Sequence, residues 1–156
     1  MAQDFKPVGG VVRVLLYPAD SVKKALFSSE GCQVQFAVRP IELELLEDRS
    51  SYEERAESSK GQTKVAHILS AVSDRDMARR WLESDFLEQA SIEGLIAQVI
   101  LADGRRLLAG YSSLFEAEQP LRLESLTSTS GVALCDRPSV TLRLVSYDTE
   151  FSCEVL

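Results

Sequence analysis

The chain has 156 residues, and its 24 Asp and Glu residues against 17 Lys and Arg residues give a formal net charge of −7. A surface of this sign repels phosphate backbones, so we expect no tight binding to nucleic acid. Hydrophobic residues make up 45% and charged residues 26% of the chain, which excludes a disordered composition and is typical of a globular protein. We therefore expect a single β-rich domain over residues 1–156 that folds without a metal or a disulfide.

The cysteines and the N-terminal residues indicate the cellular compartment in which we expect the protein. Cys32, Cys135 and Cys153 are an odd number at wide spacing, which favours reduced thiols over a disulfide framework. The start, MAQDFKPVGG, lacks the basic region and the long apolar run of a signal peptide, and no apolar run approaches the length of a membrane span. These features favour a cytoplasmic protein with no membrane partner.

Residues 1–10 are expected to form a flexible lead. The β-prone run 11–17 follows as the first strand and ends at Pro18. Asp20 and Ser21 could cap a single helical turn that reaches Ala25.

Alternating apolar residues then predict strands over 34–38 and 41–45. The parity of the alternation changes across Pro40, as if one residue had been inserted. A bulge or bend at Pro40 would return the apolar side chains to one face, and we expect it at an edge strand or at a switch between sheets.

Residues 47–61, EDRSSYEERAESSKG, are polar and charged and have no apolar period. Such a segment cannot form core, so we expect a projecting polar loop or a long exposed hairpin. Because Tyr52 is its only large apolar residue, the segment should be dispensable for folding. The next run, 62–72, is again β-like.

A helix is predicted from Ser73 to about Ala90. Ser73 is followed three residues later by Asp76, which is a variant of the capping box. Apolar residues at helical spacing would form one face, and they are Met77, Ala78, Trp81 and Leu82. Ser84–Asp85 could break this helix or cap it again.

The stretch 95–111, LIAQVILADGRRLLAGY, predicts a β-hairpin. Its two β-prone arms are joined by Asp103-Gly104, which fits a two-residue type I′ turn because Gly tolerates a positive φ. The first arm is apolar on both faces, so we expect it in a sheet covered on both sides, by a second sheet or a helix, or at a subunit contact. The turn would set three cross-strand pairs: Ile100 with Leu107, Val99 with Leu108, and Ile96 with Tyr111.

Further strands are predicted over 121–125, 140–144 and 151–155. Together the runs make about seven or eight strands around one helix, without βαβ alternation. The predicted fold is therefore mainly β with one α-helix, arranged as an antiparallel β-sandwich or a partly closed barrel.

His67 is the single histidine of the chain and lies in a β-like run. A histidine can carry a proton or bind a metal, whereas the more ordinary interpretation is a strand histidine that is half-buried or at an interface. A serine–histidine–acid arrangement stays open, because such triads assemble across a fold.

No other pattern indicates chemistry. The cysteines form no CxxC pair, so structural zinc is not expected. Glu42 and Glu44 alternate with apolar residues, which favours the solvent face of a strand over a calcium site. Gly9-Gly10 and Asp103-Gly104 predict turns, since neither lies in a phosphate-binding frame. We therefore assign no catalytic, cofactor-binding or metal-binding residue and expect no cofactor.

The chain resembles the subunits of phage tail tubes and the related haemolysin-coregulated protein of type VI secretion. The resemblance rests on a mainly β domain of this size with one capped helix, the Asp-Gly hairpin, the polar 47–61 segment and the acidic charge. Within residues 118–152, the stretches EQPLRLESLTSTSG and DRPSVTLRLVSYDTEFS are also similar to proteins of prophage regions. The resemblance implies ring-forming subunits whose sheets line a channel, with the polar segment reaching a neighbouring ring.

The function implied is that of a non-enzymatic structural or assembly protein of phage or phage-like, tail-associated origin. Its partners would be copies of itself or other phage structural proteins, in the cytoplasm or in a virion. Two other classes stay open. A small-ligand-binding β-barrel would need an enclosed polar-lined pocket, and a hydrolase centred on His67 would need that side chain hydrogen-bonded in a cleft beside Ser and Asp.

Overall fold

Two antiparallel sheets make up the body of the molecule. The computed structural model describes residues 10–46, 49–76, 79, 85–112, 117–130, 138–148 and 150–156. The first sheet contains β1 (Val11–Pro18), β4 (Ile41–Leu43), β7 (Leu95–Leu101), β8 (Arg106–Ala109) and β13 (Cys153–Glu154). The second contains β5 (Ser51–Ser59), β6 (Gln62–Asp74), β11 (Arg122–Thr129) and β12 (Ser139–Asp148). Outside them lie the pairs β2 (Val22–Phe27) with β3 (Cys32–Phe36) and β9 (Tyr111–Ser112) with β10 (Ala117–Glu118), the 3₁₀ turn η1 (Ala19–Ser21) and the helix α2 (Phe86–Ile92).

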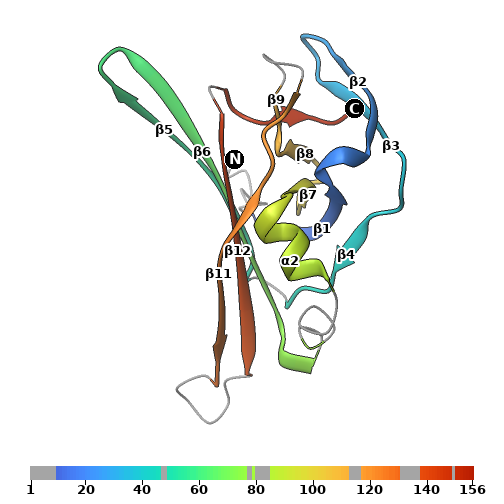
Figure 1. Ribbon diagram of the computed structural model, residues 1–156, viewed down its shortest axis with the longest axis vertical. Helices are drawn as coiled ribbons and strands as arrows, with labels where there is room; N and C mark the ends of the chain where they lie inside the picture. The colour runs from blue at the N-terminus through green and yellow to red at the C-terminus, as the bar shows by residue number, and fades with distance from the viewer. Residues whose placement is uncertain are drawn as a thin grey trace, which may run out of the picture.

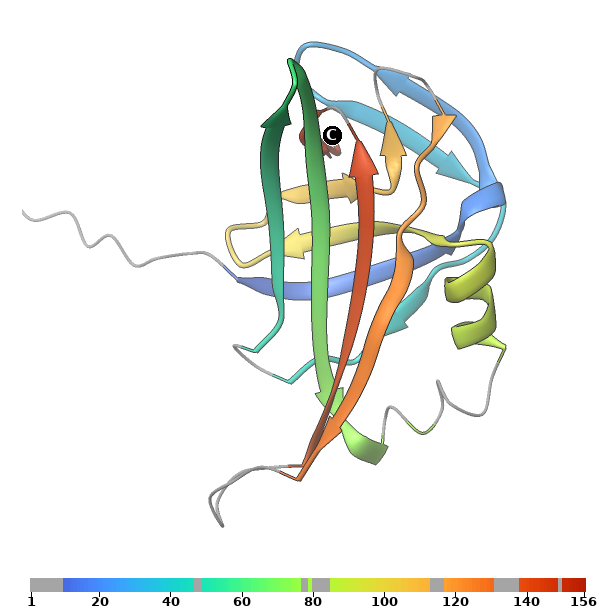
Figure 2. The same cartoon turned by 60° about the vertical axis from the view of Figure 1, so that its left-hand side comes forward.

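The strand order is β13-β8-β7-β1-β4 in the five-stranded sheet and β11-β12-β6-β5 in the four-stranded sheet. The two sheets face each other (Figure 1), and their strands cross steeply, as in an orthogonal sandwich (Figure 2). The predicted fold class, mainly β with one helix, is confirmed, and the sheets are not closed into a barrel. The described part holds thirteen strands, more than predicted, because the polar segment also forms a strand and several strands have only two residues.

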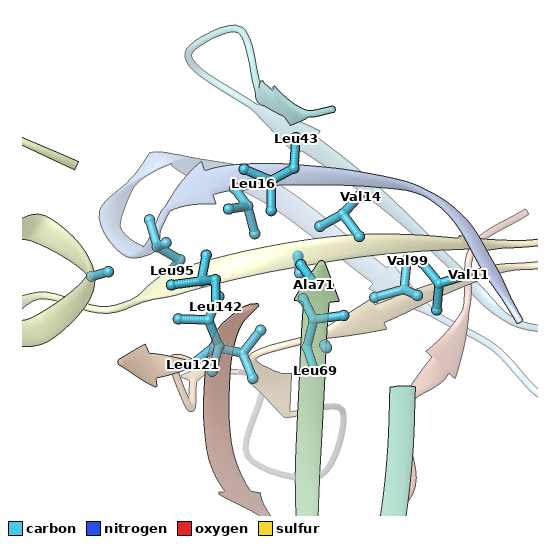
Figure 3. Close-up of a cluster of buried hydrophobic side chains, with 14 of the residues drawn as sticks. Val11, Val14, Leu16, Leu43, Leu69, Ala71, Leu95, Val99, Leu121 and Leu142 are labelled. Carbon is cyan, nitrogen blue, oxygen red and sulfur yellow. The ribbon is translucent and has the colours of Figure 1, made fainter. Parts of the chain in front are cut away.

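The main core lies between the two sheets (Figure 3). Each fully buried Leu or Val side chain there stabilises the fold by about 1.5–3 kcal/mol relative to an exposed one. α2 adds Phe86 and Ala90, which lie one helical turn apart and are both buried. The core residues labelled in the figure are Val11, Val14, Leu16, Leu43, Leu69, Ala71, Leu95, Val99, Leu121 and Leu142.

β7 is covered on both faces, as predicted. Ala97 and Val99 belong to the core between the sheets, whereas Ile96 belongs to a second buried cluster on the other face. The β2–β3 hairpin covers that second face, and Phe36 of β3 stacks on Tyr17 of β1 with ring centroids 3.6 Å apart. A sheet on one side and a hairpin on the other explain why both faces of this strand are apolar.

The register of the β7–β8 hairpin differs from the prediction by one residue. Gly104 N donates to the carbonyl of Leu101, and Leu101 N donates to the carbonyl of Arg105. Gly104 has a φ of 91°, whereas Asp103 does not adopt a positive φ. The loop is therefore a three-residue type I turn with a glycine bulge, and not a type I′ turn.

This loop changes the predicted cross-strand pairs. Val99 faces Leu107 instead of Leu108, and Ile100 faces Arg106 instead of Leu107. The predicted pair that involves Tyr111 is also wrong, since that residue lies beyond the end of β8, in β9.

Pro40 marks a switch between sheets, as predicted. β3 before it pairs with β2, whereas β4 after it forms the edge of the five-stranded sheet beside β1. The helical turn predicted from Asp20 to Ala25 is wrong beyond Ser21, because the chain from Val22 onward is extended in β2. Pairing with β3 outweighs the local capping signal there.

The predicted helix start at Ser73 is two residues early, since Ser73 and Asp74 still belong to β6, whereas the described residues 75, 76 and 79 are helical. β12 pairs with β6 as far as Asp74, and the Ser73 hydroxyl donates to the carbonyl of Glu44 instead of capping a helix. α2 starts after Asp85, where the sequence predicts a break or a second cap, although the Asp85 side chain makes no capping hydrogen bond. The predicted apolar helix face falls outside the described ranges, and its residues are Met77, Ala78, Trp81 and Leu82.

Of the two forms predicted for residues 47–61, the described part has the hairpin. β5 pairs with β6 along its whole length, and Lys60 and Gly61 make the turn with positive φ. Tyr52 packs against the main core, which argues against the expectation that the whole segment is dispensable. Residues 47–48, like the predicted lead up to residue 9, lie outside the described ranges.

Candidate functional site

His67 lies in β6 with 3% of its surface exposed, so it is more deeply buried than the half-buried strand histidine predicted. Its ring nitrogen Nδ1 is 2.8 Å from the Tyr52 hydroxyl, and Nε2 is 2.9 Å from the carbonyl oxygen of Glu150. Both ring nitrogens therefore have hydrogen-bond partners, as a buried imidazole requires.

Glu54 lies opposite His67 on β5 and accepts hydrogen bonds from the neighbouring Tyr52 and Ser152. Its Oε1 atom accepts from the Tyr52 hydroxyl at 2.9 Å and from the Ser152 amide at 3.0 Å, and the Ser152 hydroxyl donates to the same oxygen. The same oxygen is 3.8 Å from His67 Nδ1. We name Tyr52, Glu54, His67 and Ser152 the histidine network.

The β5–β6 hairpin positions three members of this network. Side chains two residues apart in a strand share a face, so Tyr52 and Glu54 both point toward the side of the sheet that carries His67. The turn at Lys60-Gly61 sets the register that places Glu54 opposite His67. The segment after β12 then brings Ser152 to this face from the far end of the chain.

Tyr52 keeps its hydroxyl proton at neutral pH. Burial raises the pKa of Tyr52 far above its ordinary value, and the negative charge of Glu54 raises this pKa further. The phenol is therefore a hydrogen-bond donor in the network and not a phenolate nucleophile.

The network does not have the arrangement of a serine hydrolase. Such an enzyme needs the serine hydroxyl on the imidazole and backbone N–H groups directed at the developing oxyanion. Here the hydroxyl and the amide of Ser152 both donate to Glu54, and His67 contacts Tyr52 instead. The arrangement connects three chain segments through buried polar groups.

Sequence reasoning singled out His67 but missed its partners. A tight turn at Lys60-Gly61, had it been assumed for the polar segment, would have placed Glu54 opposite His67. Ser152 is 98 residues from Glu54 along the chain, and no local pattern marks it. Only the packing of the C-terminal segment against β5 and β6 brings it into the network.

Two of the cysteines lie in the second buried cluster. Cys32 is fully buried and Cys153 partly buried, and both thiols are free. Burial, together with the neighbouring Cys153 thiol, raises the pKa of Cys32 to about 12. Cys135 lies outside the described ranges.

The acidic groups do not form a metal site in the part of the chain that the structure describes. Glu42 and Glu44 are exposed, as predicted for a solvent face, and Glu42 pairs with Arg13 at 2.6 Å. An open hollow of about 380 Å³ beside α2 is lined by Ile92, Gln89, Asp85, Glu88 and Glu93. It is a surface feature of one helix and differs from the enclosed pocket that a ligand-binding barrel would need.

Comparison with family models, with curated proteins and with solved structures found no match to this chain. Across the described ranges, no helix is both long enough and apolar enough to cross a membrane. The functional argument therefore rests on the geometry of the molecule itself.

Proposed function

We propose that this chain is a non-enzymatic structural or assembly protein of phage-like, tail-associated origin that acts through contacts between subunits, in the cytoplasm or in a particle. The observation that carries the proposal is the far end of the β5–β6 hairpin. We name its residues 57–64 the arm tip.

The arm tip extends beyond the body of the molecule (Figure 1). β12 pairs with β6 only as far as Val65, whereas β5 continues to pair with β6 until Ser59 meets Gln62. Every residue from Glu57 to Lys64 whose side chain is described is exposed. The tip is therefore a two-stranded polar ribbon without a third strand.

At its base the Lys64 ammonium lies 4.0 Å from the centre of the Tyr147 ring, but beyond this contact such a ribbon gains little from its own chain. A two-stranded hairpin without a packed face is marginally stable in water, and polar side chains bury no apolar area to offset the ordering of the backbone. Contacts with a neighbouring subunit would supply the missing partners. This is the role that the resemblance to tail-tube subunits implies for the polar segment.

The β5 edge supports the same proposal. β5 ends the strand order of its sheet, and an edge strand offers backbone groups to another chain. Glu53 and Arg55 stand on its outer face as an ion pair with a 2.9 Å separation. Charged side chains on an edge disfavour indiscriminate pairing, so a contact there would be selective. The net charge of −7 would also let a channel built from such subunits pass DNA without holding it.

The two other classes receive less support. The sheets are open and the space between them is filled by apolar side chains, which does not favour a ligand-binding barrel. The described groups around His67 do not form a nucleophile–base pair, which does not favour a hydrolase at that residue.

The proposal is tested by shortening the arm. Replacing residues 58–63 with Asn-Gly keeps Glu57 opposite Lys64 and closes the ribbon with a tight turn. We expect the full chain to assemble beyond a monomer in light scattering and to form regular particles in negative-stain images. The shortened chain should keep its thermal unfolding temperature and remain monomeric.

A length-matched control replaces residues 58–63 with a Gly/Ser sequence of the same length. If the tip makes specific contacts, this variant should also lose assembly. A full chain that stays monomeric at all concentrations would contradict the proposal, as would a shortened chain that assembles like the full one.

A further inference from the structure

Two free thiols meet where the C-terminal segment 150–156 joins the β2–β3 hairpin. Cys32 begins β3 and forms an isolated parallel bridge with Val155, and the Leu156 amide donates to the Cys32 carbonyl oxygen at 2.9 Å. Cys153 lies two residues before Val155, so these two side chains share a face, and both pack in the second buried cluster with Cys32. The Cys153 thiol lies at hydrogen-bonding distance from the Cys32 thiol.

The backbone on either side of this junction holds the two thiols together. Gly31 precedes Cys32, and a β-carbon at this glycine would overlap the carbonyl oxygen of Glu154. The hairpin and the C-terminal segment can approach this closely because residue 31 has no side chain. On its other side the segment pairs with β8, where Cys153 lies opposite Leu108. The two sulfur atoms are therefore within reach of each other in the folded chain.

The two thiols differ in their access to solvent. Cys153 is partly buried, whereas Cys32 is fully buried. Burial, together with the neighbouring Cys153 thiol, raises the pKa of Cys32 to about 12 and so keeps it protonated. A small oxidant that arrives from solvent should therefore react with Cys153 first.

We propose that Cys32 and Cys153 are an oxidisable pair, which a hydroperoxide converts into an intramolecular disulfide that fastens the C-terminal segment to the β2–β3 hairpin. The Cys153 thiolate attacks a peroxide oxygen and the O–O bond breaks. The alkoxide, or hydroxide where the oxidant is hydrogen peroxide, leaves with the proton that Cys153 released, and Cys153 becomes a sulfenic acid.

The second step forms the disulfide. The Cys32 sulfur attacks the Cys153 sulfur, the S–O bond breaks, and the Cys32 proton leaves with the hydroxyl group as water. The pair of thiols loses two electrons, which the peroxide takes up. Disulfides of this transient, redox-sensing kind are the ones found in reducing compartments. The pair lies within one chain and does not depend on the proposed assembly role.

The proposal is tested by treating the full chain with hydrogen peroxide at neutral pH. Intact mass spectrometry should show the loss of two hydrogens, and peptide mapping without reductant should find the peptides of Cys32 and Cys153 joined. The oxidised chain should unfold at a higher temperature, because a link between distant residues restricts the unfolded chain. Dithiothreitol should return the mass and the unfolding temperature to their starting values.

Two serine variants separate this pair from the third cysteine. Cys153→Ser removes the thiol that attacks the peroxide, so Cys32 should keep its free thiol and the unfolding temperature should not rise after treatment. Cys135→Ser leaves the pair intact and should form the link between Cys32 and Cys153 as the wild-type chain does.

A wild-type chain in which Cys153 is carried to the sulfinic acid while Cys32 keeps its thiol would overturn the proposal. So would a disulfide that joins either residue to Cys135 or to a second chain. Joined peptides without a higher unfolding temperature would contradict the fastening of the C-terminal segment. These readouts come from the wild-type chain, so they decide the question even if a variant does not fold.

Discussion

Two β-hairpins of this protein are built in opposite ways. The β7–β8 hairpin is apolar and lies between the main core and the second buried cluster, whereas the β5–β6 hairpin ends in a polar ribbon exposed to solvent. Backbone pairing is continuous in both, so pairing alone does not set their contributions to stability. The comparison teaches that side-chain burial separates a hairpin that holds the fold together from one that is available for other contacts.

The largest expected loss of stability is in the β7–β8 hairpin. Leu108 is fully buried, so Leu108→Ala should lower the free energy of unfolding by about 2–5 kcal/mol through lost burial and a residual cavity. The adjacent Leu107 is only partly buried, and Leu107→Ala should cost clearly less. Urea unfolding of both variants measures the difference, and equal losses would contradict the assignment of Leu108 to the covered face.

The next effect is at the base of the polar hairpin, where it meets the core. Tyr52→Phe removes the hydroxyl that joins His67 to Glu54, and leaves a buried ring nitrogen without its partner. We expect a loss of about 1–3 kcal/mol, which is typical when a buried polar group becomes unsatisfied. Thermal and urea unfolding would measure this loss. A neutral effect would show that the network adds little to stability.

The reactivity of the cysteines extends the comparison to the second buried cluster, which contains Cys32 and Leu108 of β8. Because burial raises the pKa of Cys32 to about 12, its neutral thiol is favoured in the folded state. The contribution of the buried Cys32 thiol to the stability of the fold is fully present below the ordinary thiol pKa of 9.0. It is lost as the pH rises from there toward the raised pKa of about 12.

In the native protein at mildly alkaline pH, Cys32 should therefore react with iodoacetamide far more slowly than Cys153, since the thiolate is the nucleophile. Peptide mapping by mass spectrometry resolves each cysteine. In urea the two rates should converge. Equal rates in the native protein would show that Cys32 is not buried in the second cluster as described.

The smallest effect is expected at the arm tip. Glu57 is exposed and lies beyond the third strand, so Glu57→Ala should change the free energy of unfolding by less than about 0.5 kcal/mol. Chemical denaturation checks this value. A loss comparable to that of Leu108→Ala would show that the tip is packed within its own chain.

The sequence by itself determined which faces are buried. The apolar character of residues 95–101 predicted a strand covered on both sides, the parity change at Pro40 predicted a switch between sheets, and the polar 47–61 segment predicted exposure at the arm tip. These features follow from the periodicity of the side chains, which can be read from a short stretch of sequence. The periodicity reflects whether each side of a strand faces solvent or the core.

Only the tertiary structure decided which segments meet. Ser73 carries a local helix signal but extends β6, because ten residues of β12 pair with that strand, and long-range pairing outweighs a single cap. The β7–β8 register depended on whether Asp-Gly closes a two-residue or a three-residue loop, and both are compatible with the same dipeptide. The histidine network needed Glu54 and Ser152, 98 residues apart, to reach one buried place. Such a contact is set by the packing of whole elements, so no local pattern could have predicted it.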